Sequence, residues 1–475
     1  MGSAPSTDPK ETAVNPTATA TQPTTLDADA LRRELSGELH LPGEPGWDGA
    51  RAAWNLAVDQ HPAAVVVPED ANDVATAIGA ARAAGLRVCV QGTGHNASAY
   101  GPLGDSLMIR TERMRDVSID PEARVARVGA GVLWGEVVAA AAEHGLAALA
   151  GTSHDVGVVG YTLGGGASWL ARKHGLASER VTAVELVDAA GEQRRVTADS
   201  DPDLLWALRG GGGNFGVVTA MEFDLLPVAE VYAGALFFPF ERAGEVLEAW
   251  RRWTLDAPDE ITSLGRLVQI PPLPDIPEPL RGNSFVMVEA AFIGGAERGA
   301  ELLAPLRELE PLIDTFAVQP PAALLALHMD PPGPVPGHGD HQMLADLDEA
   351  SLEALVEAIG PDSGSALVSF EIRHLGGALG RREEGSGALG ALKGRYMTFG
   401  VGMPATPEDA AAIGASLAAA RAALEVVDNG GNYANFAESA VDAGSIHGPR
   451  TLARLREIRA SVDPDGLLHG NHPID

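Results

Sequence analysis

Cysteine is nearly absent from the chain, since Cys89 is the single one among 475 residues. One cysteine excludes an intrachain disulfide and a cysteine-based zinc cluster. No run approaches the roughly 18 uninterrupted apolar residues that a membrane-spanning helix requires. Basic side chains are few, 34 against 65 acidic ones, and the net charge of −31 repels phosphate backbones and anionic lipids. The sequence therefore argues against nucleic acid and membrane partners.

The remaining composition is that of an ordinary folded protein, with 45% hydrophobic and 21% charged residues. The length suits two or three domains of roughly 100–200 residues each. The first 26 residues differ, because they are rich in Thr, Pro, Ala and Ser and have no apolar run. A secretory signal needs such a run, so we expect residues 1–26 to be a disordered leader and the protein to be cytoplasmic. Secretion after removal of an earlier leader stays open.

Strand and helix signals alternate after the leader. A β-branched run at 63–70, an amphipathic pattern at 72–86 and a second β-branched run at 87–92 predict a βαβ unit. Residues 181–197 predict a hairpin that turns at Gly191. We therefore expect the first domain to mix parallel and antiparallel strands with helices.

Further along the chain, strand-like runs are separated by helical ones. The strand-like runs are 236–240, 285–294, 366–378 and 395–403. They predict a second domain whose largely antiparallel sheet is flanked by helices, giving a bilobal α/β (α+β) protein. Two proline-rich segments, 269–282 and 329–343, are predicted to be loops. The predicted boundaries are 1–26 for the leader, 27–228 for the first domain, 229–425 for the second, and 426–475 for a C-terminal segment that returns to the first.

Three glycine-rich stretches stand out: QGTGHN at 91–96, the segment 151–176, and LRGGGGNFGVVTAMEF at 208–223. Glycines let the backbone turn tightly and aim several N–H groups at one anion. Three such stretches within about 130 residues suggest a long anionic cofactor that lies along loops. Neither G-x-G-x-x-G opening a helix nor G-x-x-x-x-G-K-[ST] is present, so a Walker-type nucleotide hydrolase is disfavoured. A strand-to-loop turn remains the simpler interpretation of 91–96 taken alone.

Taken together, these stretches resemble the FAD-binding (PCMH-type) domain of the vanillyl-alcohol-oxidase superfamily, and within it the berberine-bridge-enzyme-like group. The resemblance rests on QGTGHN, VGVVGYTLGGG (156–166), DLLWALRGGGGNFGVVT (203–219), and the C-terminal Tyr433, Asn435 and DPDGLLHGN (463–471). These motifs occur in the family's order over roughly 410 residues. The resemblance implies a bilobal FAD enzyme with a separate substrate domain.

The resemblance also implies cofactor-binding residues. His95 matches the histidine that bonds the flavin 8α-methyl carbon. Ser153 stands where doubly linked members have cysteine, which excludes a cysteinyl link and leaves one bond to His95 or none. The full set implied to bind FAD is Gln91, Gly92, Thr93, Gly94, His95, Asn96, Thr152, Ser153, Val156, Gly157, Gly160, Tyr161, Gly165, Gly166, Gly216, Val218, Tyr433, Asn435 and Asn471.

Two side chains are candidates for the catalytic proton transfer. Tyr433 is implied to face the flavin, and its pKa near 10 would have to be lowered for it to act as a base. Packing on the flavin edge is the alternative role. Glu371 alternates with Arg373 on one face of a predicted strand, so both could reach the substrate or simply pair with each other. We expect no metal site, although His328, His338 and His341 lie near Asp330 and Asp340.

The sequence thus predicts an FAD-dependent oxidoreductase that acts on a small organic substrate. We expect hydride transfer from a C–H beside a hydroxyl or amine to flavin N5, and then electron transfer to molecular oxygen with formation of hydrogen peroxide. By the resemblance, the small Val156 favours an oxidase. A dehydrogenase of the same fold and a flavin-binding protein without turnover are the alternatives. A role in secondary metabolism is implied by the resemblance alone.

Overall fold

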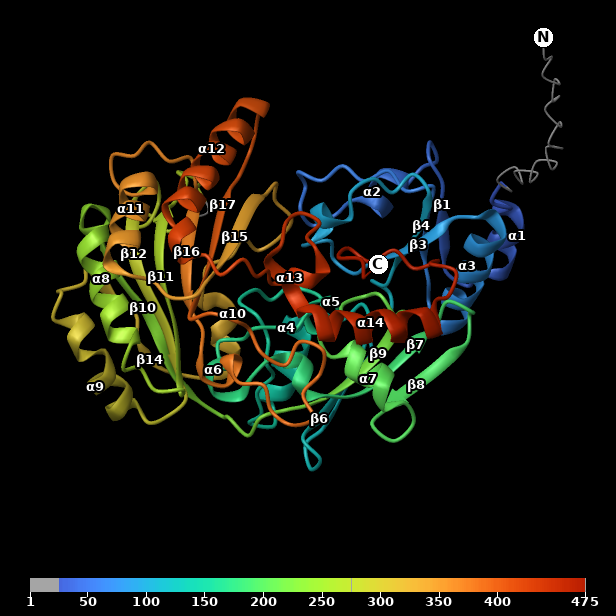
Figure 1. Cartoon of the computed structure of the whole chain (residues 1–475), viewed down its shortest axis with the longest axis horizontal. Coiled ribbons are helices and arrows are strands. Elements are labelled where there is room, and N and C mark those ends of the chain that lie inside the picture. Colours follow the sequence, from blue (N-terminus) through green and yellow to red (C-terminus); the bar gives the residue numbers. More distant parts are fainter. Residues whose placement is uncertain (1–24, 275, 475) are drawn as a thin grey trace, which may run out of the picture.

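The computed structural model describes residues 25–274 and 276–474, and Figure 1 shows them as two lobes of mixed α/β structure. Of the predicted leader, residues 1–24 lie outside the described residues. The fold class predicted from the sequence is confirmed, with three sheets and helices packed on them. No helix in the described ranges is long and apolar enough to cross a membrane.

The first sheet has four strands in the order β1-β2-β4-β3. Both β2 and β3 run parallel to β4, so the predicted βαβ unit is present, with β4 between its two strands. Its helix α3 (Ala71–Ala84) begins where the Asp70 carboxylate accepts two backbone N–H groups, and it ends at Gly85, whose φ is 68°. The strands are β1 (Glu38–His40), β2 (Ala64–Val67), β3 (Arg87–Gln91) and β4 (Ser106–Arg110).

Strand β3 carries the single cysteine. Cys89 is buried with Trp47, Val65 and Met108. Burial raises the pKa of its thiol to about 12. The side chain is therefore a small apolar core residue rather than a reactive thiol.

The second sheet has five antiparallel strands in the order β5-β6-β9-β7-β8. The predicted hairpin is β7–β8, and Gly191 turns it with a φ of 85°. The strands are β5 (Val117–Asp120), β6 (Val125–Gly129), β7 (Val181–Val187), β8 (Gln193–Thr197) and β9 (Val217–Asp224). The other helices of this lobe are α1 (Ala28–Glu34), α2 (Trp47–Arg51), α4 (Trp134–Ala142), α5 (Val158–Leu163), α6 (Ala171–His174) and α7 (Pro202–Leu208).

The second lobe is built on an eight-stranded sheet whose pairs are all antiparallel, as predicted. Its strand order is β13-β10-β12-β11-β16-β17-β15, and β14 pairs with β10. The strands are β10 (Val231–Pro239), β11 (Ile261–Gln269), β12 (Ser284–Phe292), β13 (Ile313–Asp314), β14 (Ala317–Gln319), β15 (His338–Leu344), β16 (Ser369–His374) and β17 (Tyr396–Gly402).

Helices cover the face of this sheet that lies away from the first lobe, which we call the outer face (Figure 1). They are α8 (Ala243–Thr254), α9 (Ala296–Arg307), α11 (Glu349–Ile359) and α12 (Pro407–Ala423). Trp250 of α8 lies over Gly265 of β11, where an added Cβ would come 2.9 Å from the indole ring. The inner face of the sheet turns toward the first lobe, with the short helix α10 (Leu324–Leu327) beside it.

One prediction for this lobe was wrong. The segment 329–343 was predicted to be a loop, but residues 338–343 belong to β15, which pairs with β17. The prolines lie before the strand, and β15 is at the sheet edge, where a proline-rich neighbour removes no ladder hydrogen bond. Gly339 fits the strand because an added Cβ would come 2.7 Å from the Phe399 ring.

The end of the chain lies against the first lobe. Helix α13 (Ala443–His447) leads into α14 (Pro449–Val462), which packs on α7. Beyond it, the Asp463 carboxylate accepts the backbone N–H groups of Leu467 and Leu468, and His469 N–H donates to Val88 O at 2.8 Å. The last residues thereby join the edge of the first sheet, while the predicted domain boundaries remain predictions.

Candidate flavin site

The loop 91–96 leaves β3 and approaches the segment around Trp54. Trp54 N–H donates to Thr93 O at 2.9 Å. Gly94 has a φ of 89°, and an added Cβ would come 2.8 Å from Ala53 Cα. A side chain here would be both strained and blocked, so the tight turn requires glycine.

The imidazole ring of His95 has a stacking partner on its face and a hydrogen-bond partner at one edge. Its ring stacks on Trp54 with centroids 4.1 Å apart and planes 18° from parallel. Its Nδ1 lies 2.7 Å from Thr93 Oγ1, while the buried Nε2 has no hydrogen-bond partner and lies 3.5 Å from Asp155 Oδ1. Trp54 and Thr93 therefore fix the orientation of the ring that is predicted to bond the flavin.

Asp155 lies beside His95 and is not among the predicted site residues. Its carboxylate accepts hydrogen bonds from Trp54 Nε1 at 2.5 Å and from Ser153 Oγ at 2.8 Å. Burial alone would raise the pKa of Asp155, but the nearby imidazole of His95 and the hydrogen bonds from Trp54 and Ser153 outweigh burial and hold the pKa well below its usual range. Asp155 is therefore an anion beside the imidazole.

The second glycine-rich stretch divides into two kinds of position. Gly157 lies beside the first loop, since an added Cβ would be 3.7 Å from Thr93 Cγ2, and Gly160 has nothing within 4 Å. Gly164 and Gly166 are instead filled by protein, because an added Cβ would meet Asn435 Oδ1 at 1.8 Å and the Tyr161 ring at 2.4 Å respectively. Of these four glycines, Gly157 and Gly160 leave the backbone open to a ligand.

Several other glycines of the motifs are explained by packing in the same way. An added Cβ at Gly165 would come 2.9 Å from the Leu389 side chain, and at Gly216 it would come 2.8 Å from Leu186. Val218 is buried in β9, and Val156 packs against the first lobe's core. These contacts leave the predicted flavin roles of the four residues untested.

Residues near the C-terminus contact the loop 91–96. Asn471 Nδ2 donates to Asn96 Oδ1 at 2.7 Å, and Asn96 Nδ2 donates to Ala437 O at 3.0 Å. Asn435 Nδ2 donates to Tyr161 O at 2.9 Å. The structure thus brings together predicted residues that are 274 and 375 positions apart in sequence.

Buried polar atoms without a partner mark the same region. They include both amide atoms of Gln91, the hydroxyls of Tyr161 and Tyr433, and His95 Nε2. Buried polar groups are normally hydrogen-bonded, so such a cluster points to a polar ligand. Together with the open backbone at Gly157 and Gly160, these donors and acceptors fit a flavin dinucleotide.

Tyr433 is fully buried, and burial raises the pKa of its hydroxyl well above its usual range. Its ring stacks with Phe436, and Phe436 lies under the Arg373 guanidinium at 4.8 Å. The lowered pKa that a tyrosinate base requires is absent. The neutral hydroxyl can instead donate a hydrogen bond.

Glu371 and Arg373 do pair, and they belong to a larger charge network on the inner face of the eight-stranded sheet. Glu371 receives Arg373 Nε at 2.7 Å and lies 3.0 Å from His328 Nε2. Glu289 lies 2.7 Å from His328 Nδ1 and 3.0 Å from Arg266 Nη1. These five residues, which we call the inner charge network, are largely buried.

The inner charge network is ionised at neutral pH. Burial alone would raise the pKa of Glu371, but Arg373 and His328 outweigh burial and hold it well below its usual range. Burial and Arg266 alone would lower the pKa of His328, but Glu289, Asp330 and Glu371 raise it to about 9. Each buried charge therefore depends on its neighbours.

The network faces the first lobe. The His328 ring meets Trp169 edge-on with centroids 6.4 Å apart, and Thr152 Oγ1 donates to Asp330 Oδ2 at 2.8 Å. Because His328 pairs with carboxylates and His341 Nε2 accepts Tyr433 N–H at 3.1 Å, the loop histidines do not converge. Among residues 25–274 and 276–474, no group of three or more metal-binding side chains is placed to hold an ion.

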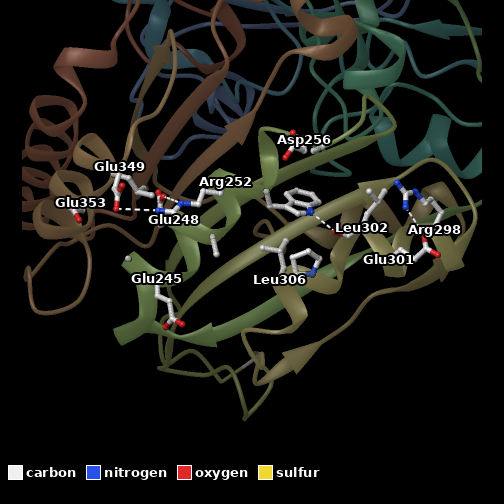
Figure 2. Close-up of a pocket in the computed structure, with 16 residues that line it drawn as sticks. Glu245, Glu248, Arg252, Asp256, Arg298, Glu301, Leu302, Leu306, Glu349 and Glu353 are labelled. Carbon is white, nitrogen blue, oxygen red and sulfur yellow. Dashed lines mark hydrogen bonds and ion pairs between the residues drawn. The ribbon is translucent and has the colours of Figure 1, made fainter.

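Figure 2 shows a cavity of about 860 Å³ in another place, between α8, α9 and α11 on the outer face. Its lining includes Glu245, Glu248, Asp256, Glu301, Glu349 and Glu353. None of the predicted site residues lines it, and its carboxylates disfavour an anionic cofactor.

Residues 62–197 match the family described as FAD binding domain. The uncharacterized FAD-linked oxidoreductase YvdP of Bacillus subtilis is 28% identical over 92% of this chain and 97% of that protein. Residues 62–197 are therefore an FAD-binding domain, and the chain is similar over most of its length to an FAD-linked oxidoreductase. The (R)-6-hydroxynicotine oxidase of Paenarthrobacter nicotinovorans is 36% identical over 40% of this chain and 42% of that enzyme. This second alignment and one with YgaK of Bacillus subtilis span only about half of those relatives.

The fold is also found among solved structures. The wild-type BBE-like 1 protein of Physcomitrella patens superposes with a TM-score of 0.82, at 21% identity, over 95% of this chain and 99% of that one. The FAD-binding domain predicted from the glycine-rich stretches is thus confirmed, and FAD is its cofactor.

Proposed function

We propose that this flavoprotein is an oxidase that carries FAD on a single histidyl bond to His95. The observation that carries the proposal is the imidazole of His95, stacked on Trp54 and hydrogen-bonded to Thr93 at the start of the FAD-binding loop. Ser153 supports a single bond, because its hydroxyl cannot form a thioether. When bound, the flavin supplies a two-electron acceptor for the C–H bond of the substrate.

Side chains of the protein bind and orient the substrate. We assign to the Glu371 carboxylate, which is ionised and held by Arg373 and His328, the acceptance of a hydrogen bond from the substrate's hydroxyl or amine. Its lowered pKa makes Glu371 a hydrogen-bond acceptor rather than a strong base. The neutral hydroxyl of Tyr433 donates a hydrogen bond that orients the substrate's hydroxyl or amine. Burial between the lobes keeps bulk water from these groups.

The substrate class is proposed from the similarity to two oxidases. The (R)-6-hydroxynicotine oxidase and the glucooligosaccharide oxidase of Sarocladium strictum align with this chain at 36% identity each. We therefore propose a small organic molecule with a C–H beside an amine or a hydroxyl, and molecular oxygen as the electron acceptor. An amine panel and an oligosaccharide panel are the first substrates to test.

The cofactor test uses purified protein denatured in acid and separated on a denaturing gel. Flavin fluorescence at the protein band that is lost in His95→Ala supports the histidyl bond. A yellow protein that releases all its FAD contradicts the covalent bond to His95 but is consistent with an FAD-binding fold. A protein that binds no added FAD contradicts the proposal altogether.

The activity test follows the flavin absorbance and the oxygen concentration with each panel. Flavin bleaching with matching oxygen uptake and peroxide formation supports an oxidase. Bleaching without oxygen uptake identifies a dehydrogenase, and no bleaching with any compound identifies a flavin-binding protein without turnover.

A further inference from the structure

Three groups converge on the carboxylate of Asp155. Trp54 donates to Oδ2 at 2.5 Å, Ser153 donates to Oδ1 at 2.8 Å, and His95 Nε2 lies 3.5 Å from Oδ1. The side chain of Asp155 is only 13% exposed. The reaction proposed above does not use this carboxylate, although it lies beside the ring that binds the cofactor.

The surroundings of His95 define which ring nitrogen carries the proton. An ionised carboxylate accepts hydrogen bonds and cannot donate one, so Asp155 favours the tautomer with hydrogen on Nε2. The Nδ1 lone pair then faces the Thr93 hydroxyl at 2.7 Å. Trp54 binds both partners, since its ring stacks on His95 while its N–H holds Asp155.

Resting on the proposed histidyl bond, we propose that Asp155 is the positioning residue for attachment of the flavin to His95. It keeps hydrogen on Nε2, leaves Nδ1 as the nucleophile, and stabilises the positive charge that the ring gains as the bond forms. The same carboxylate orients the imidazole in a way that Thr93 alone cannot.

The attachment balances with dioxygen as the oxidant. One C–H bond of the flavin 8α-methyl group breaks, and its proton leaves to water. A bond forms between Nδ1 and the 8α-carbon, and the Nε2 proton is lost once the bond is complete. The two electrons released reduce the flavin ring, which dioxygen reoxidises to give hydrogen peroxide.

Ser153 supports this role from the position where doubly linked relatives have cysteine. Its hydroxyl donates to Asp155 and so helps to fix the carboxylate beside His95. The position that carries the cysteinyl bond in doubly linked relatives thereby assists the histidyl bond in this protein.

The experiment compares wild type, Asp155→Asn and Asp155→Glu, with exposed Asp199→Asn as the matched control. Total FAD is read from visible absorbance, and bound FAD from gel fluorescence and intact protein mass. Asp155→Asn should keep its FAD but attach it at least about tenfold more slowly. Asp155→Glu should restore part of the rate, and the control should match wild type.

Each outcome bears on one statement. Wild type without attached flavin contradicts the histidyl bond rather than Asp155. Attachment of FAD in Asp155→Asn at the wild-type rate overturns the role of Asp155. A variant that loses total FAD and thermal stability as much as it loses attached FAD also overturns the role, because its defect is then in folding. If Asp155→Asn is insoluble, Ser153→Ala decides, because it keeps the carboxylate but frees it: slower attachment supports the role, and the wild-type rate overturns it.

Discussion

The two faces of the eight-stranded sheet bury opposite kinds of side chain from the same strands. On β16, Phe370 and Ile372 point to the outer face and join its apolar core, while Glu371 and Arg373 point to the inner face. On β12, Val288 joins the apolar core and Glu289 the inner charge network. Burying ion pairs is seldom the most stable solution, so a polar face against the flavin lobe indicates chemistry rather than folding.

The largest expected effect is on the inner face. Glu289→Ala removes the partner of both Arg266 and His328 and leaves their charges buried. We expect a loss of about 3–5 kcal/mol in the free energy of unfolding, measured by urea denaturation. A loss below about 1 kcal/mol would mean that water already screens these charges.

The next effect is a pH dependence of stability confined to the inner face. The pKa of His328 is raised in the folded protein from 6.5 to about 9, so its stabilisation is complete below pH 6.5 and is lost as pH rises through about 9. The difference is on the order of 3 kcal/mol. Urea denaturation at pH 6 and pH 9.5 should show it in wild type, and His328→Gln should lack it.

A smaller effect is expected on the outer face of the same strand. Ile372→Val removes one methylene from a tightly packed core and should cost about 0.5–1.5 kcal/mol, with no change in flavin absorbance. The measurement is thermal unfolding with the visible spectrum recorded alongside. An altered flavin spectrum would show that the two faces are coupled.

The smallest effect is expected at the outer cavity of Figure 2. Glu245 pairs with Arg242 at 2.7 Å, and its side chain is 54% exposed. Exposed ion pairs contribute about 0–1 kcal/mol, so Glu245→Gln should change thermal stability only slightly and flavin reduction not at all. Loss of flavin reduction would give this cavity a functional role.

The parts of the site that lie within short sequence motifs could be predicted from the sequence. The loop 91–96, the role of Gly94 in its turn, and the return of Asn471 to Asn96 were all within reach of motifs. Gly165 and Gly166 were predicted for cofactor contact, which stays a prediction, while the structure also shows that the side chains of Leu389 and Tyr161 lie where their Cβ atoms would be. A run of glycines indicates that another group lies close to the backbone, but it does not identify that group as a cofactor or a protein side chain.

Contacts between distant segments were out of reach. Trp54 and Asp155 are 101 positions apart, and neither belongs to a motif that names the other. The inner charge network joins β11, β12, β16 and the residue after α10, an arrangement that depends on the strand order of the sheet. The proximity of Asp155 to Ser153 in GTSHDVG was the one available signal.

The burial of Cys89 has a practical consequence for following this protein in solution. Its thiol is 1% exposed and has a pKa of about 12, so maleimide dyes should leave the folded chain unlabelled. A cysteine placed on either lobe would then be the sole attachment point for a fluorophore. Pairs of such positions would report distances between the lobes by energy transfer, with the native sequence otherwise intact.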